Sequence, residues 1–378
     1  VTSSVLQFNY AGYCINILDT PGHQDFSEDT YRTLMAADSA VMVIDASKGV
    51  EAQTRKLFKV CVMRHIPIFT FINKMDREAR DTFELLDDIE KELGIATCPV
   101  NWPIGSGKAF KGVYDREHRE IELFSDTQKG TKMGEVKKIS LDDPELSTLI
   151  EEDALSLLEE EVELLDGASA EFDQELVSKG ELSPVFFGSA LTNFGVETFL
   201  QHFLSMTSSP LPRKSDKGEI DPMTEKDFSA FVFKIQANMN KAHRDRIAFM
   251  RICSGEFEAG MEVYHMQGGR KVRLSQPQQM MASERKMVEK AYGGDIIGVF
   301  DPGIFSIGDT LTTSAERFCY EGIPTFAPEH FARVRQVDTM KRKQFIKGIN
   351  QIAQEGAIQI FQEYNTGICL LYTSDAAD

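Results

Sequence analysis

Apolar runs and amphipathic stretches alternate over the first hundred residues of the chain. Runs with the apolar content of strands occupy 13–19, 39–47 and 66–74. Stretches with apolar residues at helical spacing occupy 27–37, 52–64 and 82–93. Because strands separated by helices of this length form parallel sheets with crossover connections, an α/β domain is predicted here.

The same alternation returns much later in the chain. Residues 180–204 read as one more strand and helix, so the α/β domain is predicted to cover 1–207, with an insert at about 99–180. Within the insert, the apolar residues of 146–165 follow helical spacing. They predict a helix with one apolar stripe and an acidic back.

The pattern changes after 208–227, a polar segment with three prolines that is predicted to be a linker. Short strands separated by glycine-containing turns follow, and they predict a small antiparallel β-barrel over 228–315. A helical pattern at 341–362 indicates part of a third, α+β domain covering 316–369. Residues 370–378 match neither the composition nor the periodicity before them, and we expect an artefactual tail outside the fold.

The formal net charge of −18 is concentrated in one part of the chain. Residues 142–181 hold fifteen acidic side chains and one lysine, and the remainder is near balance. An acidic protein of this kind is not expected to bind free nucleic acid, DNA included, as a general partner. The acidic stretch is either a solvated helix face or a surface that repels wrong nucleic-acid contacts.

The cysteines and the apolar runs limit the class of protein. Six cysteines are widely scattered without a CxxC pair, which disfavours a zinc site or a disulfide framework and fits a reducing cytoplasm. No apolar run is long enough to span a bilayer, and the first residues lack a signal-peptide pattern. We therefore expect a cytoplasmic protein without a membrane partner.

Asn73, Lys74, Met75 and Asp76 lie at the carboxyl end of a buried run, where ligands bind in open parallel sheets. The Asp76 carboxylate can accept hydrogen bonds from N1–H and the exocyclic amine of guanine, whereas adenine offers no matching donor pair. Asn73 can serve the other edge of the base or pin neighbouring loops, and the Lys74 stem can lie across the ring. The same string of residues also occurs in surface turns.

A second polar segment, Asp19, Thr20, Pro21, Gly22 and His23, begins where the first run ends. Asp19 can hold a water in the shell of Mg²⁺. The Gly22 N–H can contact a terminal phosphate, which allows the following segment to act as a switch. His23 can orient an attacking water, although such a histidine on its own is more often a capping or packing residue.

A third segment follows the apolar run of 183–187. Backbone N–H groups of Ser189, Ala190 and Leu191 can bond the guanine O6 oxygen. This short string carries little information alone, but at the end of the last strand of the domain it completes a base pocket.

The strings "DTPGH", "NKMD" and "GSAL", in this order, resemble the third, fourth and fifth nucleotide motifs of translational GTPases. The flanking stretches 1–61 and 101–115 resemble the bacterial peptide chain release factor 3 family, the class II release factor GTPases that recycle class I factors from the ribosome after peptide release. The likeness runs from Val1 to about Gly367. It implies a G domain, a β-barrel second domain and a third domain.

The resemblance also implies cofactors, partners and residue roles. GTP or GDP and Mg²⁺ are the implied cofactors, and the ribosome and class I release factors are the implied partners. Residues 19–23 carry over as phosphate and switch residues, with His23 in the catalytic role. Asn73, Lys74 and Asp76 carry over as guanine readers, with Met75 in the same segment.

A phosphate loop of the form GxxxxGK[ST] is absent from the sequence. The string "IGSGKAF" does not qualify, because Trp102 stands where the first glycine belongs and Ala109 replaces the Mg²⁺-binding hydroxyl. The resemblance places that loop and the switch I ligand upstream of Val1. We therefore expect a truncated chain that binds GTP poorly alone and is inactive, although the complete protein is expected to be a GTPase.

Two other functions stay open. One is an elongation factor G-like translocase, which belongs to the same enzyme class. The acidic insert and the segments 1–8 and 101–115 favour the release factor. The other is a non-hydrolysing ribosome-binding module, in which Asp19, His23 or Asp76 should be replaced by another residue. All three residues are intact.

Overall fold

The computed structural model describes residues 4–20, 28–124, 136–237, 246–275, 278–281, 284–323, 330–356, 358–362 and 369–373. The chain divides into two compact units, one formed by 39–208 and the other by 1–38 together with 209–378. The division after residue 208 lies next to the predicted boundary at 207, whereas residues 1–38, predicted to belong to the α/β domain, group with the later part of the chain. Each unit is described by itself.

The unit 39–208 is built on a four-stranded parallel sheet, as the alternating pattern predicts. Its strand order is β3 (Ala40–Asp45), β4 (Ile68–Asn73), β10 (Leu182–Phe187) and β5 (Ala96–Pro99). The helices of this unit's α/β part are α2 (Ala52–Met63), α3 (Thr82–Leu93) and α7 (Val196–Met206). β4 and β10 occupy the two inner positions, so nearly every residue of both strands is buried, which explains their continuous apolar sequences.

Local signals in the sequence fix the ends of α3. The Asp81 side chain accepts a hydrogen bond from the Glu84 N–H at 3.0 Å, which satisfies one of the free amides of the first turn. Gly94 ends the helix with φ 69°, a left-handed conformation that glycine adopts without a steric penalty. These two residues explain why the predicted range 82–93 matches the observed helix.

Aromatic side chains join the sheet to α7. Phe69 and Phe71 of β4 make edge-to-face contacts with Phe203 and Phe199, at ring-centroid distances of 4.9 and 5.4 Å. Phe186 of β10 contacts Phe199 in the same way at 5.0 Å. The edge-to-face geometry favours such pairs beyond their buried area, so α7 is held firmly beside the strands that carry the candidate site.

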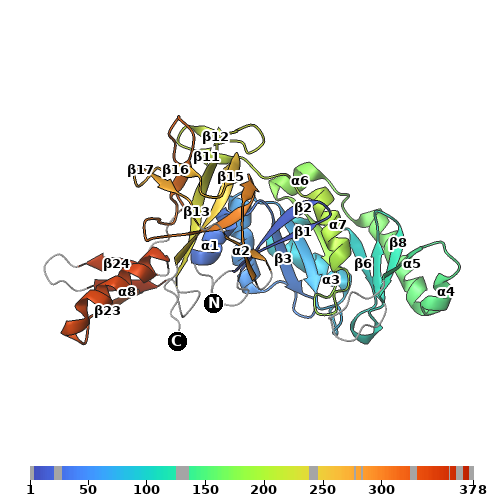
Figure 1. Cartoon of the computed structure of the whole chain (residues 1–378). Helices are drawn as coiled ribbons and strands as arrows, with labels where there is room; N and C mark the ends of the chain where they lie inside the picture. Colours follow the sequence, from blue (N-terminus) through green and yellow to red (C-terminus); the bar gives the residue numbers. More distant parts are fainter. Residues whose placement is uncertain are drawn as a thin grey trace. The chain divides into compact units, whose positions relative to one another are not determined.

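The insert forms an antiparallel sheet and several helices, and its sheet lies at the end of this unit away from β3 (Figure 1). Its sheet order is β6 (Asn101–Ile104), β7 (Gly112–Asp115), β8 (Glu120–Phe124) and β9 (Val136–Ser140). A short 3₁₀ helix, η1 (Gly107–Ala109), joins β6 to β7, and α4 (Leu146–Leu149), α5 (Glu152–Ala168) and α6 (Gln174–Lys179) follow the sheet.

The single helix predicted over 146–165 is wrong in one respect, because two helices occupy this stretch. Ile150 is extended and buried between α4 and α5, so its side chain fills the core while its backbone interrupts the helix. Leu158, Val162 and Leu165 form the predicted apolar stripe of α5. Most acidic residues of α5 are exposed, in agreement with a solvated helix face.

In the other unit, β1 (Ser4–Tyr10) and β2 (Tyr13–Asp19) form an antiparallel hairpin. This corrects the prediction that 13–19 belongs to the parallel sheet: within the described ranges, β2 pairs with β1 only. Ala11 and Gly12 close the hairpin with φ values of 48° and 82°, as in two-residue turns that match strand twist. Closing a loop of two residues costs little chain entropy, which favours β1 as the partner of β2. The apolar periodicity of 13–19 does not show with which strand it pairs.

Residues 28–38 are tied to the β-rich part of the same unit. The helix α1 (Glu28–Met35) is followed by Asp38, whose Oδ2 lies 2.6 Å from Arg251 Nη1. Arg251 also donates to the Ala36 carbonyl at 2.6 Å. The Arg251 guanidinium is buried, and Asp38 and the Ala36 carbonyl are its acceptors there. These contacts help to explain why residues 1–38 group with the later residues.

An eight-stranded antiparallel sheet forms the β-rich second domain. Its order is β17 (Arg270–Arg273), β16 (Glu262–His265), β22 (Thr310–Thr312), β13 (Ser229–Ala237), β14 (Arg246–Ser254), β21 (Ile296–Phe300), β18 (Gln278–Met281) and β19 (Glu284–Met287). A small sheet of β15 (Glu256–Glu258) and β20 (Lys290–Tyr292) accompanies it. The antiparallel arrangement agrees with the prediction. Among the described strands, β17 and β19 are the two edges of the sheet and do not pair with each other, so the hydrogen bonding does not close a barrel.

The linker and the last part of the chain differ from the sequence predictions. The segment 208–227 contains a hairpin of β11 (Arg213–Ser215) and β12 (Gly218–Ile220). The last part contains β23 (His330–Val334), η2 (Thr339–Lys341), α8 (Arg342–Gln354), β24 (Gln359–Gln362) and β25 (Cys369–Thr373).

The helix predicted over 341–362 ends at Gln354, because Gly356 turns the chain with φ 80° and a strand follows. Residues 370–373, which were predicted to lie outside the fold, belong to β25 at the centre of a three-stranded sheet between β23 and β24. A strand between two others takes its hydrogen bonds from both, and composition alone does not reveal such a position.

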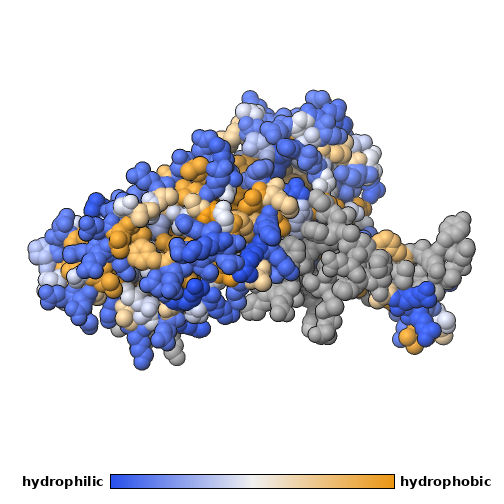
Figure 2. Space-filling view, turned by 180° about the vertical axis from the view of Figure 1, so that it is seen from behind, coloured by the Kyte–Doolittle hydropathy of each residue, from blue (hydrophilic) through white to orange (hydrophobic). Residues whose placement is uncertain are grey.

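The surface seen in Figure 2 is covered mostly by hydrophilic residues, with hydrophobic residues between them. Over the described parts of the chain, no helix combines the length and the apolar character that crossing a membrane requires.

Candidate functional site

The two predicted base-recognition segments lie side by side, because β4 and β10 are neighbours in the parallel sheet. Asn73 is the last residue of β4, and Ile72 is paired in register with Phe187, the last residue of β10. Gly188 follows directly and donates its N–H to the Ile72 carbonyl at 3.0 Å. The segments 73–76 and 189–191 therefore leave the same edge of the sheet, where open α/β folds bind ligands.

The Asn73 amide holds these two segments together. Its Oδ1 accepts hydrogen bonds from the Lys74 N–H at 2.8 Å and from the Ala190 N–H at 2.9 Å. Of the two roles that the sequence left open for Asn73, the structure has it pinning the loops. Its Nδ2 makes no hydrogen bond to the described residues and is free to donate to a ligand.

The Asp76 carboxylate is oriented by a serine hydroxyl. Ser189 Oγ donates to Asp76 Oδ1 at 2.5 Å, and Ser189 is fully buried. Asp76 Oδ2 has no hydrogen-bond partner in the part of the chain that the structure describes. A carboxylate held on one oxygen and open on the other suits a ligand with adjacent N–H donors, such as guanine. Sequence reasoning gave Ser189 only a backbone role and missed this contact.

Met75 anchors the segment through its backbone. The whole residue is buried, so Met75 supports the segment and is not exposed to a ligand. The Met75 N–H donates to the Gly188 carbonyl at 3.1 Å, and the Met75 carbonyl accepts from the Gly107 N–H at 2.8 Å. Gly107 belongs to the string that was rejected as a phosphate loop, and its role here is to support the segment 73–76.

Lys74 makes an ion pair that the sequence did not reveal. Its Nζ lies 2.7 Å from Oδ2 of Asp45, the last residue of β3, which is paired in register with Asn73. Burial alone would raise the pKa of Asp45, but hydrogen bonds from Lys74 and Ser47 lower it to about 2. Asp45 is thus ionised at neutral pH and fixes the end of the lysine, while the predicted contact of the Lys74 stem with a base stays a prediction.

Glycine is required at the start of the loop 188–195. A Cβ atom on Gly188 would lie 2.5 Å from the Phe194 carbonyl oxygen and 2.8 Å from Phe71 Cζ, closer than such atoms can approach. The loop is closed by hydrogen bonds between Ser189 and Phe194, with N–O distances of 2.9 and 3.0 Å. Any larger residue at position 188 would therefore displace Ser189 from Asp76.

The predicted contact of this loop with guanine O6 is only partly compatible with the observed bonding. The Ser189 N–H donates to Phe194, and the Ala190 N–H donates to Asn73. Leu191 is highly exposed, and its N–H makes no hydrogen bond within the described residues. A ligand oxygen would bond the Leu191 N–H or share the Ala190 N–H.

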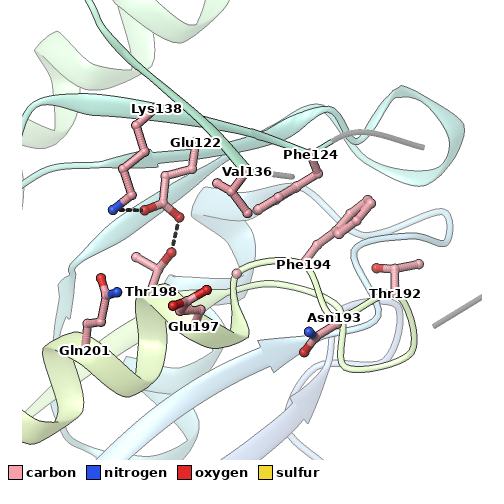
Figure 3. Close-up of a pocket in the computed structure, with 11 residues that line it drawn as sticks. Glu122, Phe124, Val136, Lys138, Thr192, Asn193, Phe194, Glu197, Thr198 and Gln201 are labelled. Atoms are coloured by element: carbon pink, nitrogen blue, oxygen red, sulfur yellow. Dashed lines mark hydrogen bonds and ion pairs between the residues drawn. The ribbon is translucent and has the colours of Figure 1, made fainter. Parts of the chain in front are cut away.

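A cavity of about 280 Å³ lies beside this loop (Figure 3). Phe124 and Phe194 stack at one end with ring centroids 4.4 Å apart, and Glu122 bonds Lys138 and Thr198 at the other. None of the residues 73–76 lines the cavity, so it is separate from the base-recognition edge.

The predicted phosphate and metal residues lie in the other unit. Asp19 is exposed at the end of β2, and Thr20 follows it. Pro21, Gly22 and His23 lie outside the described residues. An exposed carboxylate at a strand end is chemically suited to an Mg²⁺-bound water, and the assignment of Mg²⁺ to Asp19 stays a prediction.

Three family models match successive parts of the chain. The elongation factor Tu GTP binding domain matches residues 1–209, elongation factor G domain 2 matches 227–314, and the class II release factor RF3 C-terminal domain matches 320–371. A protein of Symbiobacterium thermophilum named peptide chain release factor 3 is 61% identical over 367 residues, which cover 97% of this chain and 69% of that protein. The chain belongs to the peptide chain release factor 3 family.

Other relatives of this family agree. Proteins of the same name from Gloeobacter violaceus and Ligilactobacillus salivarius are 56% and 54% identical over 95% and 98% of this chain. The chain spans about two thirds of the length of these relatives, 67% and 70%. A crystal structure from Thermus thermophilus has a TM-score of 0.75 at 21% identity and covers 98% of this chain and 55% of its own. That likeness shows a shared fold, and together with the family models it gives a multidomain translational GTPase fold.

Proposed function

We propose that the complete protein is a ribosome-dependent GTPase of translation termination, which promotes the dissociation and recycling of class I release factors after peptide release. The observation that carries the guanine part of this proposal is the Asp76 carboxylate, held at 2.5 Å by Ser189 beside the free amide of Asn73. Donors and acceptors at this edge match guanine and not adenine. The names of the relatives support the ribosome as partner, and the match of 320–371 favours a release factor over a translocase.

The residues 19–23 supply the other half of the proposed mechanism. His23 orients the water that attacks the terminal phosphate, and Gly22 contacts that phosphate through its N–H. Asp19 would hold Mg²⁺ through a water, and the ion would supply positive charge to stabilise the transferred phosphoryl group. Thr20 and Pro21 complete the segment, which changes between the GTP and GDP states. The reducing cytoplasm is the proposed location.

Ribosome-stimulated GTP hydrolysis by the complete protein tests this function. His23→Ala should lower the stimulated rate by about 10²–10⁴-fold, the usual effect of losing a positioned catalytic group, while GDP affinity is kept. His65→Ala is the matched control, because His65 is an exposed histidine that belongs to none of the three motifs.

Two outcomes would contradict the proposal. Unchanged turnover in His23→Ala would remove this histidine from the mechanism. An absence of ribosome-stimulated hydrolysis in the unmodified protein would support a non-hydrolysing binding module. Release of a labelled class I factor from termination complexes, measured with and without GTP, separates recycling from translocation.

A further inference from the structure

Asp115, His118 and His202 come together outside the base-recognition site. Asp115 is the last residue of β7, His118 lies in the turn before β8, and His202 lies on α7. The insert sheet and the α/β part of the same unit thus each contribute to one cluster. None of the three has a role in the function proposed above.

The donor atoms of the three side chains converge. Asp115 Oδ2 lies 2.8 Å from His202 Nε2 and 2.9 Å from His118 Nδ1, and all three candidate donor atoms lie within 4.8 Å of one another. The side chains of Asp115 and His202 are 3% exposed, whereas that of His118 is 59% exposed. The cluster is therefore enclosed on two sides and open to solvent on the third.

Backbone hydrogen bonds fix the orientation of the carboxylate. Asp115 Oδ1 accepts from the Glu117 N–H at 3.0 Å and from the His118 N–H at 3.1 Å. This turn occupies one oxygen and directs the other, Oδ2, at the two imidazoles. The neighbouring Arg116 guanidinium is engaged with Asp166 at 2.9 Å.

Both ring nitrogens of His202 face carboxylate oxygens. Nδ1 lies 2.8 Å from Glu117 Oε2, and Nε2 lies 2.8 Å from Asp115 Oδ2. A neutral imidazole has one N–H, which can satisfy only one of these acceptors. If Nδ1–H is donated to Glu117, the Nε2 lone pair points at a carboxylate oxygen, and a cation between them removes the repulsion. A histidine held by a carboxylate on its outer nitrogen is the usual arrangement of a metal ligand.

We propose that Asp115 Oδ2, His118 Nδ1 and His202 Nε2 bind one divalent transition-metal ion of the zinc type, with water at a fourth position on the open side. Two imidazoles and a carboxylate suit Zn²⁺, whereas Mg²⁺ and Ca²⁺ prefer all-oxygen sites. Tetrahedral ligands at about 2.0–2.1 Å from zinc lie roughly 3.3 Å apart, so the 2.8–2.9 Å separations need to widen by only a few tenths of an ångström. The scattered cysteines led to the prediction that a zinc site is disfavoured, but the ligands proposed here include no cysteine.

Titration of the chelator-treated full chain with Zn²⁺ tests the site, with calorimetry as the readout and Co²⁺ absorption as an independent report of tetrahedral ligation. The unmodified chain should bind one equivalent. His118→Gln should weaken that binding at least tenfold, and because His118 is exposed the variant is expected to fold. His65→Gln, which removes an exposed histidine elsewhere in the unit, should bind as the unmodified chain does.

The Zn²⁺ affinity of Glu117→Gln distinguishes binding at the proposed site from nonspecific binding of zinc to surface side chains. Glu117 does not contact the metal in this arrangement, yet loss of a carboxylate that orients a ligand typically costs about 10–100-fold in affinity. A decrease of this size, with the Co²⁺ spectrum retained at higher concentration, supports the proposal. Equal Zn²⁺ affinities for His118→Gln and His65→Gln would overturn it, as would the absence of a one-equivalent step.

Discussion

Replacing Ser189 by alanine in the complete protein removes the hydroxyl that bonds Asp76 in the proposed guanine site. The same hydroxyl also accepts a long hydrogen bond from the Thr192 N–H at 3.4 Å, which the variant loses as well. Ser189 Oγ donates to Asp76 Oδ1 at 2.5 Å, and the serine is fully buried. Hydrogen bonds to charged groups contribute about 1.5–3 kcal/mol. Because Asp76 is half-buried and water can replace the hydroxyl, we expect a loss near the lower limit, which corresponds to about tenfold weaker GDP binding.

The matched control is Ser183→Ala on β10, the strand that precedes the loop of Ser189. Ser183 is also fully buried, and its hydroxyl bonds Thr70 Oγ1 at 2.7 Å, away from the carboxylate. Both variants should lose about 1 kcal/mol of unfolding free energy, but only Ser189→Ala should weaken nucleotide binding.

Fluorescent GDP titration gives the affinities, and competition with IDP, which lacks the exocyclic amine, gives the base discrimination. Ser189→Ala should reduce both GDP affinity and the GDP-to-IDP ratio, since a poorly oriented Asp76 distinguishes the two bases less well. If Ser189→Ala and Ser183→Ala have equal affinities and equal ratios, the hydroxyl does not orient a guanine-binding carboxylate.

Three further substitutions test the packing around the sites. Asp38→Ala leaves the buried Arg251 guanidinium, 2.6 Å from Asp38, without its counter-ion and should lower the free energy of unfolding by about 3–5 kcal/mol in urea titrations; a loss below about 1 kcal/mol would contradict this. Asp45 has its pKa lowered from 3.8 to about 2, so its ion pair with Lys74 stabilises the fold above pH 4 and this contribution is lost as the pH falls from about 4 to 2. Because Lys74 is half-exposed, the contribution should be about 1 kcal/mol, and Asp45→Asn should flatten that part of the stability–pH curve; parallel curves would refute it. Gly188→Ala places a Cβ 2.5 Å from a carbonyl oxygen and should cost about 1–3 kcal/mol of stability together with weaker GDP binding; unaltered binding would show that the loop tolerates displacement.

Strand runs and polar residues at strand ends were sufficient to predict the parallel sheet and the meeting of segments 73–76 and 189–191. The buried character of β4 is visible in its sequence because both faces of an inner parallel strand are covered. Once β4 and β10 are neighbours, their carboxyl ends must adjoin. Asn73 and Asp76 could therefore be placed at one edge without coordinates.

Contacts between distant residues explain what the sequence did not reveal. The Lys74 ion pair with Asp45, the support from Gly107 and the Ser189 hydroxyl bond each join residues far apart in the chain. No local pattern encodes them. A polar residue at the end of β3 was the one signal that could have pointed to Asp45.

The remaining wrong predictions concern which strands pair and where a helix is interrupted. The run 13–19 has the alternation of a strand but carries no information on its partner, and the two-residue turn at 11–12 makes the local antiparallel partner favourable. Residues 370–373 likewise form a strand only because two neighbouring strands supply hydrogen bonds on both sides. The buried Ile150 breaks a helix whose periodicity continues across the break.

The nucleotide preference of the complete protein carrying Asp76→Asn tests the central claim most directly. An amide at position 76 cannot accept from both guanine donors, but it can donate to the 2-carbonyl of xanthine. Competition titrations should show GDP binding weakened by about 10²-fold or more and XDP bound in preference to GDP. A variant that still prefers GDP over XDP would contradict the assignment of Asp76 as the guanine reader.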